Sequence, residues 1–256
     1  MSGIAAVRLV AADAAGLRRF YADAFGFVPA GDTPDGIVLR LGGQTVELIV
    51  FDPPGRPYPD GVASFDRRFQ HFALVVTDMD ASMGRLSTVP GWTPISRGGP
   101  QTLPEASGGV TAFKFRDPEG HPLELLAFPE GGLPERWRTP SGDGPFLGID
   151  HTAIVVGDTA ASLAFYARFG LAEAGHTLNQ GPEQDRLDGA DGVAVDVTRL
   201  EAAVAGPPAL ELLCYRGPAG PAAPPPSPRD AAATRTVLAE GNGTLRRDPD
   251  GHLVVA

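Results

Sequence analysis

The chain contains an internal repeat, and this repeat limits the folds that it can form. The segment HFALVVTD, from His71 to Asp78, recurs as HTAIVVGD, from His151 to Asp158. A degenerate copy, AVRLVAAD, runs from Ala6 to Asp13. Each copy alternates like a strand and ends in Asp, which starts helices by accepting a hydrogen bond from a first-turn amide. A repeat of this length is a supersecondary unit that buries its apolar face against its neighbours.

A second recurring element closes each unit with a strand that contains one glutamate. These strands are TVELIVF with Glu47, PLELLAF with Glu124 and ALELLCY with Glu211. A turn signature is present twice, as DPEG at 117–120 and DPDG at 248–251, where Pro presets the turn and Gly adopts a backbone conformation that other residues avoid. Each unit is therefore predicted to be a strand, a helix and further strands that end in the Glu strand.

Four such units are predicted, and the last one is truncated because only EGNGTLRR separates its first strand from its turn. The units are 4–52, 68–128, 148–217 and 231–256. Stretches rich in Gly and Pro, 129–145 and 218–230, read as linkers. We predict an α+β fold of tandem βαβββ modules, with curved mixed sheets and helices on their outer face. The first linker divides it into two domains, 1–130 and 146–256.

Composition excludes several classes of function. The 256 residues carry a formal net charge of −10, which argues against a nucleic-acid partner because such partners need a basic surface. No apolar run approaches the roughly 18 residues of a membrane span, and the start lacks the pattern of a signal peptide. The single Cys214 rules out an internal disulfide. A cytoplasmic protein with a small-molecule substrate is expected, and a homodimer is compatible with the sequence.

Strand alternation places two histidines and two glutamates on corresponding faces of their units. Phe72 and its alternate neighbours face the helix, so His71 faces the other way, and the same spacing turns His151 away from its helix. Glu124 and Glu211 each lie between two leucines that face the opposite side. A carboxylate among apolar neighbours is costly to bury unless a cation meets it, and a divalent metal held by His and Glu meets this need.

The repeated unit, with His on the first strand, Glu on the last and a DPxG turn, resembles the vicinal oxygen chelate superfamily. This superfamily includes glyoxalase I, extradiol dioxygenases and the bleomycin- and fosfomycin-resistance proteins. The resemblance implies that two units form a curved sheet around one divalent metal ion, each contributing a first-strand and a last-strand ligand. It covers nearly the whole chain, although the fourth unit matches only in its last strands.

Two ways of pairing the units predict different sites. Sequential pairing joins one with two, which offers Glu47, His71 and Glu124, and three with four, which offers only His151 and Glu211. Crossed pairing joins two with three and one with four, as in single-chain glyoxalase I enzymes with four units. We favour the crossed pairing because it brings all four ligand types, His71, Glu124, His151 and Glu211, into one site.

The first hypothesis is a metal-dependent, glyoxalase-like lyase or isomerase that acts on a small molecule chelating the metal through adjacent oxygens. The metal is Zn, Ni, Co, Mn or Fe, held by His71, Glu124, His151 and Glu211. The resemblance to glyoxalase I implies Glu211 as the catalytic base, with Glu124 facing it as the alternative. No clear basic cluster is present for the carboxylates of glutathione, which counts against the methylglyoxal reaction. Substrate-binding residues are not predicted.

Two alternatives remain open. An extradiol-type, ring-cleaving dioxygenase needs Fe(II) or Mn(II) in a triad of two His and one carboxylate, and here the extra carboxylate counts against it. A metal-free small-molecule binding or resistance protein needs apolar groups in its cleft, which the 13 Phe could supply. Outside the quartet, His121 and His252 are interpreted as structural, and His176 as a loop residue. The polar run 179–186 is interpreted as a solvated loop, with the mouth of a pocket as the alternative.

Overall fold

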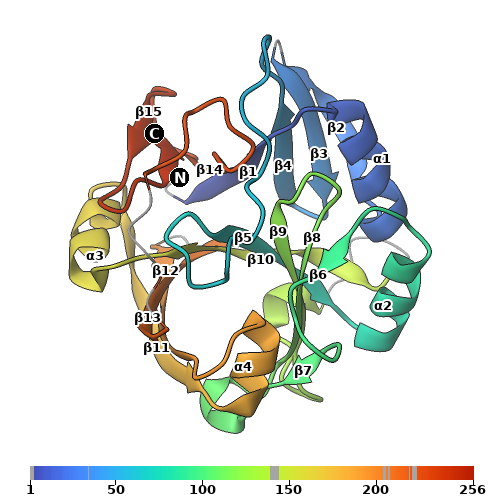
Figure 1. The fold of residues 1–256 in the computed structure, drawn as a ribbon, viewed down its shortest axis with the longest axis vertical. Helices are drawn as coiled ribbons and strands as arrows, with labels where there is room; N and C mark the ends of the chain where they lie inside the picture. The colour runs from blue at the N-terminus through green and yellow to red at the C-terminus, as the bar shows by residue number, and fades with distance from the viewer. Residues whose placement is uncertain are drawn as a thin grey trace.

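The computed structural model describes residues 3–33, 35–138, 144–203, 206, 208–218, 220 and 224–256. The described residues form an α+β structure with two open, curved, mixed sheets and helices on the outside (Figure 1). The first unit comprises β1 (Ile4–Val10), α1 (Ala14–Phe25), β2 (Val28–Thr33), β3 (Gly36–Leu41) and β4 (Gln44–Ile49). The second unit comprises β5 (Gln70–Val76), α2 (Met79–Ser87), β6 (Thr93–Pro94), β7 (Gln101–Thr102), η1 (Glu105–Ser107), β8 (Thr111–Arg116) and β9 (Pro122–Ala127).

The second half of the chain repeats this plan, but the third unit has an additional helix and the fourth unit has none. The third unit comprises β10 (Phe146–Val155), α3 (Thr159–Ala167), β11 (Leu171–Gln180), α4 (Pro182–Asp188), β12 (Ala194–Ala202) and β13 (Ala209–Gly217). The fourth unit comprises β14 (Arg235–Leu238), β15 (Leu245–Arg247) and β16 (Leu253–Val255). Its residues 231–256, all of them described, contain no helix, as the short segment before its turn predicts. One 3-10 turn, η2 (Glu135–Trp137), lies between the halves.

Aspartate caps start the three helices that follow the repeated first strands. The side chain of Asp13 accepts a hydrogen bond from the amide of Gly16. Asp78 and Asp158 do the same for α2 and α3, with oxygen-to-nitrogen distances of 2.9 and 3.0 Å. The prediction that these residues act as N-caps is confirmed, and the reason is local: each carboxylate satisfies an amide that has no partner within the helix.

The two sheets combine units that are not consecutive in the sequence. One sheet has the strand order β15-β16-β14-β1-β4-β3-β2 and therefore joins units one and four. The other runs β11-β12-β13-β10-β5-β9-β8-β6, with β7 paired to β8, and joins units two and three. This is the crossed pairing. Each sheet takes strands from both halves of the chain. The division into domains 1–130 and 146–256 stays a prediction.

Hydrophobic cores, in contrast, join units that follow each other. In one core, Tyr21 and Phe25 of α1 pack with Phe72 of β5 and Phe115 of β8, which links unit one to unit two. In another, Tyr166 of α3 packs with residues of β10, β14 and β16, which links unit three to unit four. Each unit therefore shares a sheet with one other unit and a hydrophobic core with another.

Two interpretations of residues 176–186 are wrong. His176 lies within β11 and not in a loop. The run 179–186 is not a solvated loop, because its second half begins α4, with Pro182 in the first turn and the buried residues Leu187 and Asp188 in the last. Its polar composition predicted a loop because only one face of this short helix is buried.

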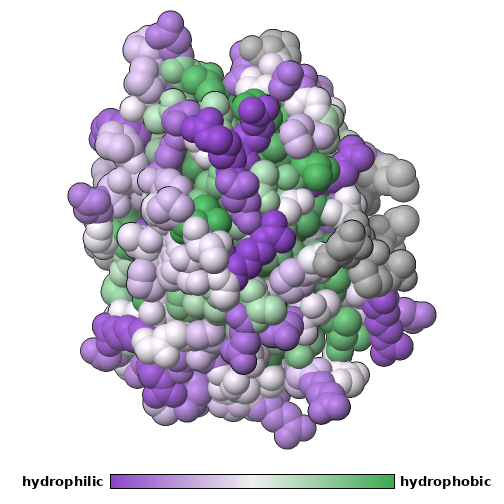
Figure 2. All heavy atoms as spheres, turned by 90° about the vertical axis from the view of Figure 1, so that its right-hand side faces the viewer, coloured by the Kyte–Doolittle hydropathy of each residue, from purple (hydrophilic) through white to green (hydrophobic). Residues whose placement is uncertain are grey.

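The outer surface mixes polar and apolar side chains. On the face that carries α1 and α2, hydrophilic and hydrophobic residues are interspersed (Figure 2). No helix of the described residues is long and apolar enough to cross a lipid bilayer.

A buried hydrogen-bond network at the DPEG turn connects the first two units. The hydroxyl of Tyr21 donates to Asp117 Oδ2. The His121 ring reaches the same carboxylate through Nδ1, at 2.9 Å, and the carbonyl of Val10 through Nε2, at 3.1 Å. Units three and four contain the counterpart, in which Tyr166 donates to Asp248 and His252 Nε2 donates to the carbonyl of Val155. Both histidines therefore have structural contacts, as predicted.

The surroundings of His121 favour its charged form. Burial disfavours the imidazolium, but the charge of Asp117, its hydrogen bond and the charge of Glu119 outweigh burial and raise the pKa of His121 above its ordinary value. The geometry agrees, because both ring nitrogens face acceptors and a neutral ring has only one N–H to donate.

We expect His121→Gln to lower the free energy of unfolding more at about pH 6 than at about pH 9. A raised folded-state pKa contributes stability that is complete below the unfolded pKa of about 6.5 and is lost as the pH rises through the folded value. Urea unfolding of wild type and variant at both pH values measures the difference. His252→Gln is the matched control, because it makes the same substitution at the corresponding turn histidine, whose ring donates to the carbonyl of Val155. A pH-independent effect of His121→Gln would contradict the assignment.

Candidate metal site

The four predicted ligands lie on the four central strands of the sheet shared by units two and three. His71 is on β5, Glu124 on β9, His151 on β10 and Glu211 on β13. The antiparallel pairing of β5 with β10 sets each His opposite an alanine, His151 opposite Ala73 and His71 opposite Ala153. Parallel pairing sets Glu124 beside Ala73 and Glu211 beside Ala153. The two alanines leave room between the four longer side chains.

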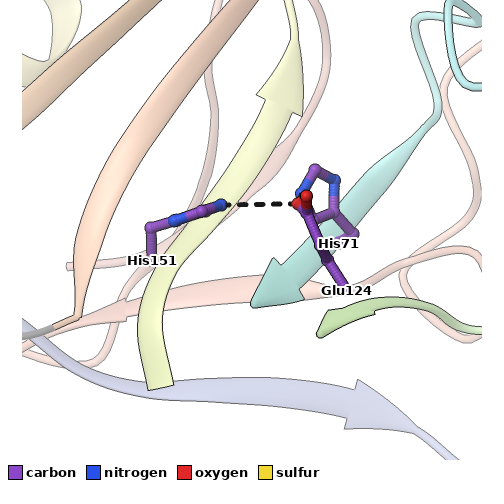
Figure 3. A group of neighbouring side chains, drawn as sticks. All are labelled: His71, Glu124 and His151. Atoms are coloured by element: carbon purple, nitrogen blue, oxygen red, sulfur yellow. Dashed lines mark hydrogen bonds and ion pairs between the residues drawn. The ribbon is translucent and has the colours of Figure 1, made fainter. Parts of the chain in front are cut away.

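The side-chain atoms of this quartet converge. Glu124 Oε2 lies 2.8 Å from His71 Nε2 and 3.8 Å from His151 Nε2. In Figure 3, His151 points toward the Glu124 carboxylate and the ring of His71 lies next to it. Glu211 Oε2 is 3.5 Å from His151 Nε2. One atom each from His71, Glu124 and His151 lies within 4.8 Å of the others, and the same holds for Asp150, His151 and Glu211.

Burial and neighbouring charges hold His71 and Glu124 in forms that suit a metal. His71, Glu124 and His151 are all buried. Burial lowers the pKa of His71, which favours the neutral imidazole that metals bind. Burial alone would raise the pKa of Glu124, but hydrogen bonds from His151 and His71 and the charge of Lys114 hold it well below its ordinary value. Glu124 is therefore a carboxylate.

The raised pKa of His151 shows that its surroundings favour a positive charge. Burial disfavours its charged form, but the charge of Glu211, with the hydrogen bonds and charges of Asp150 and Glu124, raises the pKa of His151 to about 10. The carboxylates thus stabilise a proton on the ring. A divalent cation at Nε2 would satisfy the same carboxylates.

Sequence reasoning missed Asp150, which orients His151. Asp150 Oδ2 lies 3.1 Å from His151 Nδ1, so Nδ1 donates and Nε2 is left to face the other ligands. Strand alternation would send consecutive residues to opposite faces, but the register shifts between Ile149 and His151, and this bulge allows the two side chains to meet. A carboxylate on the far nitrogen is the usual support of a metal-binding histidine.

Arg199 of β12 is a second missed residue. Its NH1 group donates to Asp150 Oδ2, at 2.7 Å, and to Glu211 Oε1, at 3.1 Å. Its Nε donates to Glu201. Arg199 is the cross-strand neighbour of Glu211, but twelve residues separate the two in sequence, so only the strand pairing could have revealed it. It holds one oxygen of Glu211 and leaves Oε2 for the site.

The donor set fits a divalent metal ion. Two imidazole nitrogens and two carboxylates match the ligands that Zn, Ni, Co, Mn and Fe accept in proteins. Asp150 orients His151 by accepting a hydrogen bond from Nδ1. His71 Nδ1 is buried without a hydrogen-bond partner among the described residues. The assignment of the four residues as ligands stays a prediction.

The quartet opens into a cavity of about 340 Å³. Its wall includes the apolar side chains of Leu103, Leu126, Leu187, Val195 and Leu213. The cations in its lining, Lys114, Arg136 and Arg199, each contact a carboxylate, Lys114 with Asp188 and the two arginines with Asp150.

Comparisons with known proteins agree with this geometry. A family model, the Glyoxalase/Bleomycin resistance protein/Dioxygenase superfamily, matches residues 3–125 and 148–254. The chain belongs to this superfamily. That membership confirms the resemblance to the vicinal oxygen chelate proteins. No curated protein matches the chain.

Two solved structures show the same fold as this superfamily member. Glyoxalase I from Zea mays is 18% identical, with a TM-score of 0.62, over 100% of this chain and 92% of that one. A "putative dioxygenase" from Bacillus subtilis is 14% identical, with a TM-score of 0.56, over 98% of this chain and 83% of that one. At these identities the likeness concerns the fold alone.

The other sheet of this superfamily member retains one ligand type. Glu47 lies on β4, beside Arg8 of β1, and the Arg8 guanidinium forms an ion pair with it. The register places Ala6, Arg235 and Val255 at the positions that correspond to His71, His151 and Glu211. Glu47 is therefore the ligand-type residue that this sheet retains at the corresponding described positions, and an arginine neutralises it.

We expect Asp150→Asn to weaken divalent metal binding by roughly 10- to 100-fold, the usual effect of losing such a support. The amide is a poorer acceptor for His151 Nδ1 and removes a negative charge. Equilibrium dialysis with Zn²⁺ or Co²⁺ measures the affinity. Glu201→Gln is the matched control, since it removes another carboxylate from Arg199 without touching His151. Equal affinities of wild type and Asp150→Asn would contradict this role.

Proposed function

We propose that this chain is a metal-dependent isomerase or lyase of the glyoxalase type, acting on a small molecule that chelates the metal through adjacent oxygens. The observation that carries the proposal is that His71, Glu124 and His151 meet in the lining of one cavity, where Glu211 reaches His151 from the adjacent strand β13. These four side chains would hold the ion. When bound, the ion would supply Lewis acidity, which polarises a carbonyl group of the substrate.

Glu211 is the better candidate for the base. Glu124 is 6% exposed, and its pKa is held well below the ordinary value by its two histidine neighbours, so it binds protons poorly. The Glu211 side chain is 16% exposed and lines the cavity. Arg199 holds one of its oxygens, so the other, when it is released from the ion, is positioned to take a proton from the carbon beside a carbonyl and return it to the neighbouring carbon.

The substrate that this cavity favours is neutral over most of its length. Each cation of the described lining already contacts an acidic side chain, which leaves no obvious partner for the carboxylates of a glutathione adduct. The apolar wall residues favour a hydrophobic body instead. We therefore propose a substrate with adjacent oxygens on a compact apolar group, and not the methylglyoxal adduct.

A ring-cleaving dioxygenase is less well supported. Such a site needs open positions for both catechol and dioxygen beside two His and one carboxylate. Here Glu211 brings a second carboxylate to 3.5 Å from His151 Nε2, where it competes for one of those positions. A metal-free binder remains the other alternative, and metal content decides between it and the proposal.

We expect purified protein to bind one divalent metal ion per chain, measured by elemental analysis after dialysis. His71→Ala and His151→Ala should lose most of this metal, because each removes a nitrogen ligand. His176→Ala is the matched control: His176 lines the same cavity but is exposed and contacts Asp196. Absence of stoichiometric metal in wild type, or full occupancy in His151→Ala, would count against the proposal.

We expect the metal-loaded enzyme to exchange the carbon-bound protons beside the carbonyl of 2-hydroxyacetophenone with solvent deuterium. This probe combines adjacent oxygens with an apolar ring. Glu211→Gln should slow the exchange by roughly 100- to 10,000-fold, the usual contribution of a positioned base. Proton NMR in D₂O measures the rate, normalised to bound metal. Unchanged exchange in Glu211→Gln would exclude Glu211 as the base, and Glu201→Gln serves as the control.

A further inference from the structure

The cavity also contains a buried polar cluster that the proposed reaction does not use. Lys114 on β8 and Gln184 on α4 are 4% and 3% exposed, and both line the cavity. Lys114 is the cross-strand neighbour of Glu124, so the cluster adjoins the metal site. Its centre is the Asp188 carboxylate at the end of α4, which is also buried.

Hydrogen bonds to Asp188 fix the orientation of this cluster. Asp188 Oδ1 accepts from Lys114 Nζ, at 2.6 Å. Its Oδ2 accepts from Gln184 Nε2, at 2.9 Å, and from the hydroxyl of Tyr215, at 3.0 Å. Because an ionised carboxylate only accepts, the amide nitrogen of Gln184 must face Asp188. The amide oxygen of Gln184 therefore faces elsewhere.

Two hydrogen-bonding capacities are left over in the cluster. Gln184 Oε1 is buried and has no donor among the described residues. Lys114 has three N–H groups, and Asp188 is the one acceptor that it contacts in the described part of the chain. Lys114 and Gln184 bind the same carboxylate and both line the cavity, so the unused acceptor and the unused donors belong to neighbouring side chains of its wall. Buried polar groups without partners are costly, so a ligand that satisfies both would be bound selectively.

The charges and walls of the cavity define the group that fits. The pKa of Lys114 is raised, because the charges of Asp188 and Glu124 outweigh burial, so the ammonium stays charged. Asp188, Glu124 and Glu211 together disfavour a further anion. A neutral group must therefore accept from Lys114 and donate to Gln184, and a hydroxyl does both, whereas a carbonyl only accepts. Apolar side chains from two separate clusters, Leu126 and Leu187 in one and Val195 and Leu213 in the other, also line the cavity and suit a hydrophobic body.

We infer that Lys114 and Gln184 form a specificity subsite that binds a hydroxyl group of the substrate other than the oxygens that chelate the metal. This inference rests on the proposed function, because the chelating end of the substrate is positioned by the quartet. It narrows the substrate class to compact apolar molecules that carry adjacent chelating oxygens and a further hydroxyl.

Calorimetric titration of the Zn²⁺-loaded protein with hydroxamic acids tests the subsite. Benzohydroxamic acid has adjacent chelating oxygens and a plain ring, and its 3-hydroxy and 4-hydroxy derivatives add the hydroxyl. We expect wild type to bind at least one derivative about tenfold tighter than the parent, within the range for a single hydrogen bond such as the one donated to Gln184. Gln184→Met and Gln184→Leu should remove this preference, so that each variant binds the parent and the derivatives equally.

Tyr215→Phe is the matched control for the Gln184 variants. It also removes one hydrogen bond from Asp188 Oδ2 but leaves Gln184 Oε1 in place, so it should keep the preference for the hydroxylated probe. Equal binding of parent and derivatives by wild type, or a preference that persists in both Gln184 variants, would overturn the subsite alone. Failure of the protein to bind Zn²⁺ or benzohydroxamic acid would instead overturn the proposed function.

Discussion

The antiparallel register between β5 and β10 is the constraint on which the candidate site depends. Because His151 lies opposite Ala73 and His71 opposite Ala153, the two imidazoles lie diagonally across one strand pair, with ring centroids 5.7 Å apart. Parallel neighbours then add Glu124 and Glu211 beside the same alanines. A shift of one residue would turn either histidine to the opposite face, so the apolar face that packs under the helices also positions the ligands.

Buried carboxylates and the cations beside them are the second feature that determines the properties of the site. The cross-strand neighbour of each glutamate is a cation, Lys114 for Glu124 and Arg199 for Glu211. The two cations act differently, since Arg199 contacts Glu211 and Asp150 whereas Lys114 turns to Asp188. This asymmetry leaves Glu124 with histidine partners and Glu211 with an arginine partner. The same carboxylates that favour a proton on His151 would favour a metal ion in its place.

The two sheets show how one repeated unit supports different chemistry. In the sheet of units two and three, four ligand types meet. In the sheet of units one and four, Arg8 neutralises Glu47, and no second carboxylate or imidazole occupies the corresponding described positions. Corresponding Tyr and Asp contacts at the turns join each pair of consecutive units, Tyr21 with Asp117 and Tyr166 with Asp248. The scaffold is therefore retained where the ligands are not.

The sequence by itself determined the repeated strands, their aspartate caps and the positions of the four candidate ligands. These features are readable because a cap or a strand face depends on residues a few positions apart. Only the tertiary structure decided how the units pair, and it added Asp150, Arg199, Lys114 and Gln184 to the cavity. Asp150 was hidden by a bulge that breaks alternation, and Gln184 by a short helix with a polar composition. Arg199 and Lys114 are neighbours of Glu211 and Glu124 only because their strands are paired. No local sequence pattern predicts that pairing.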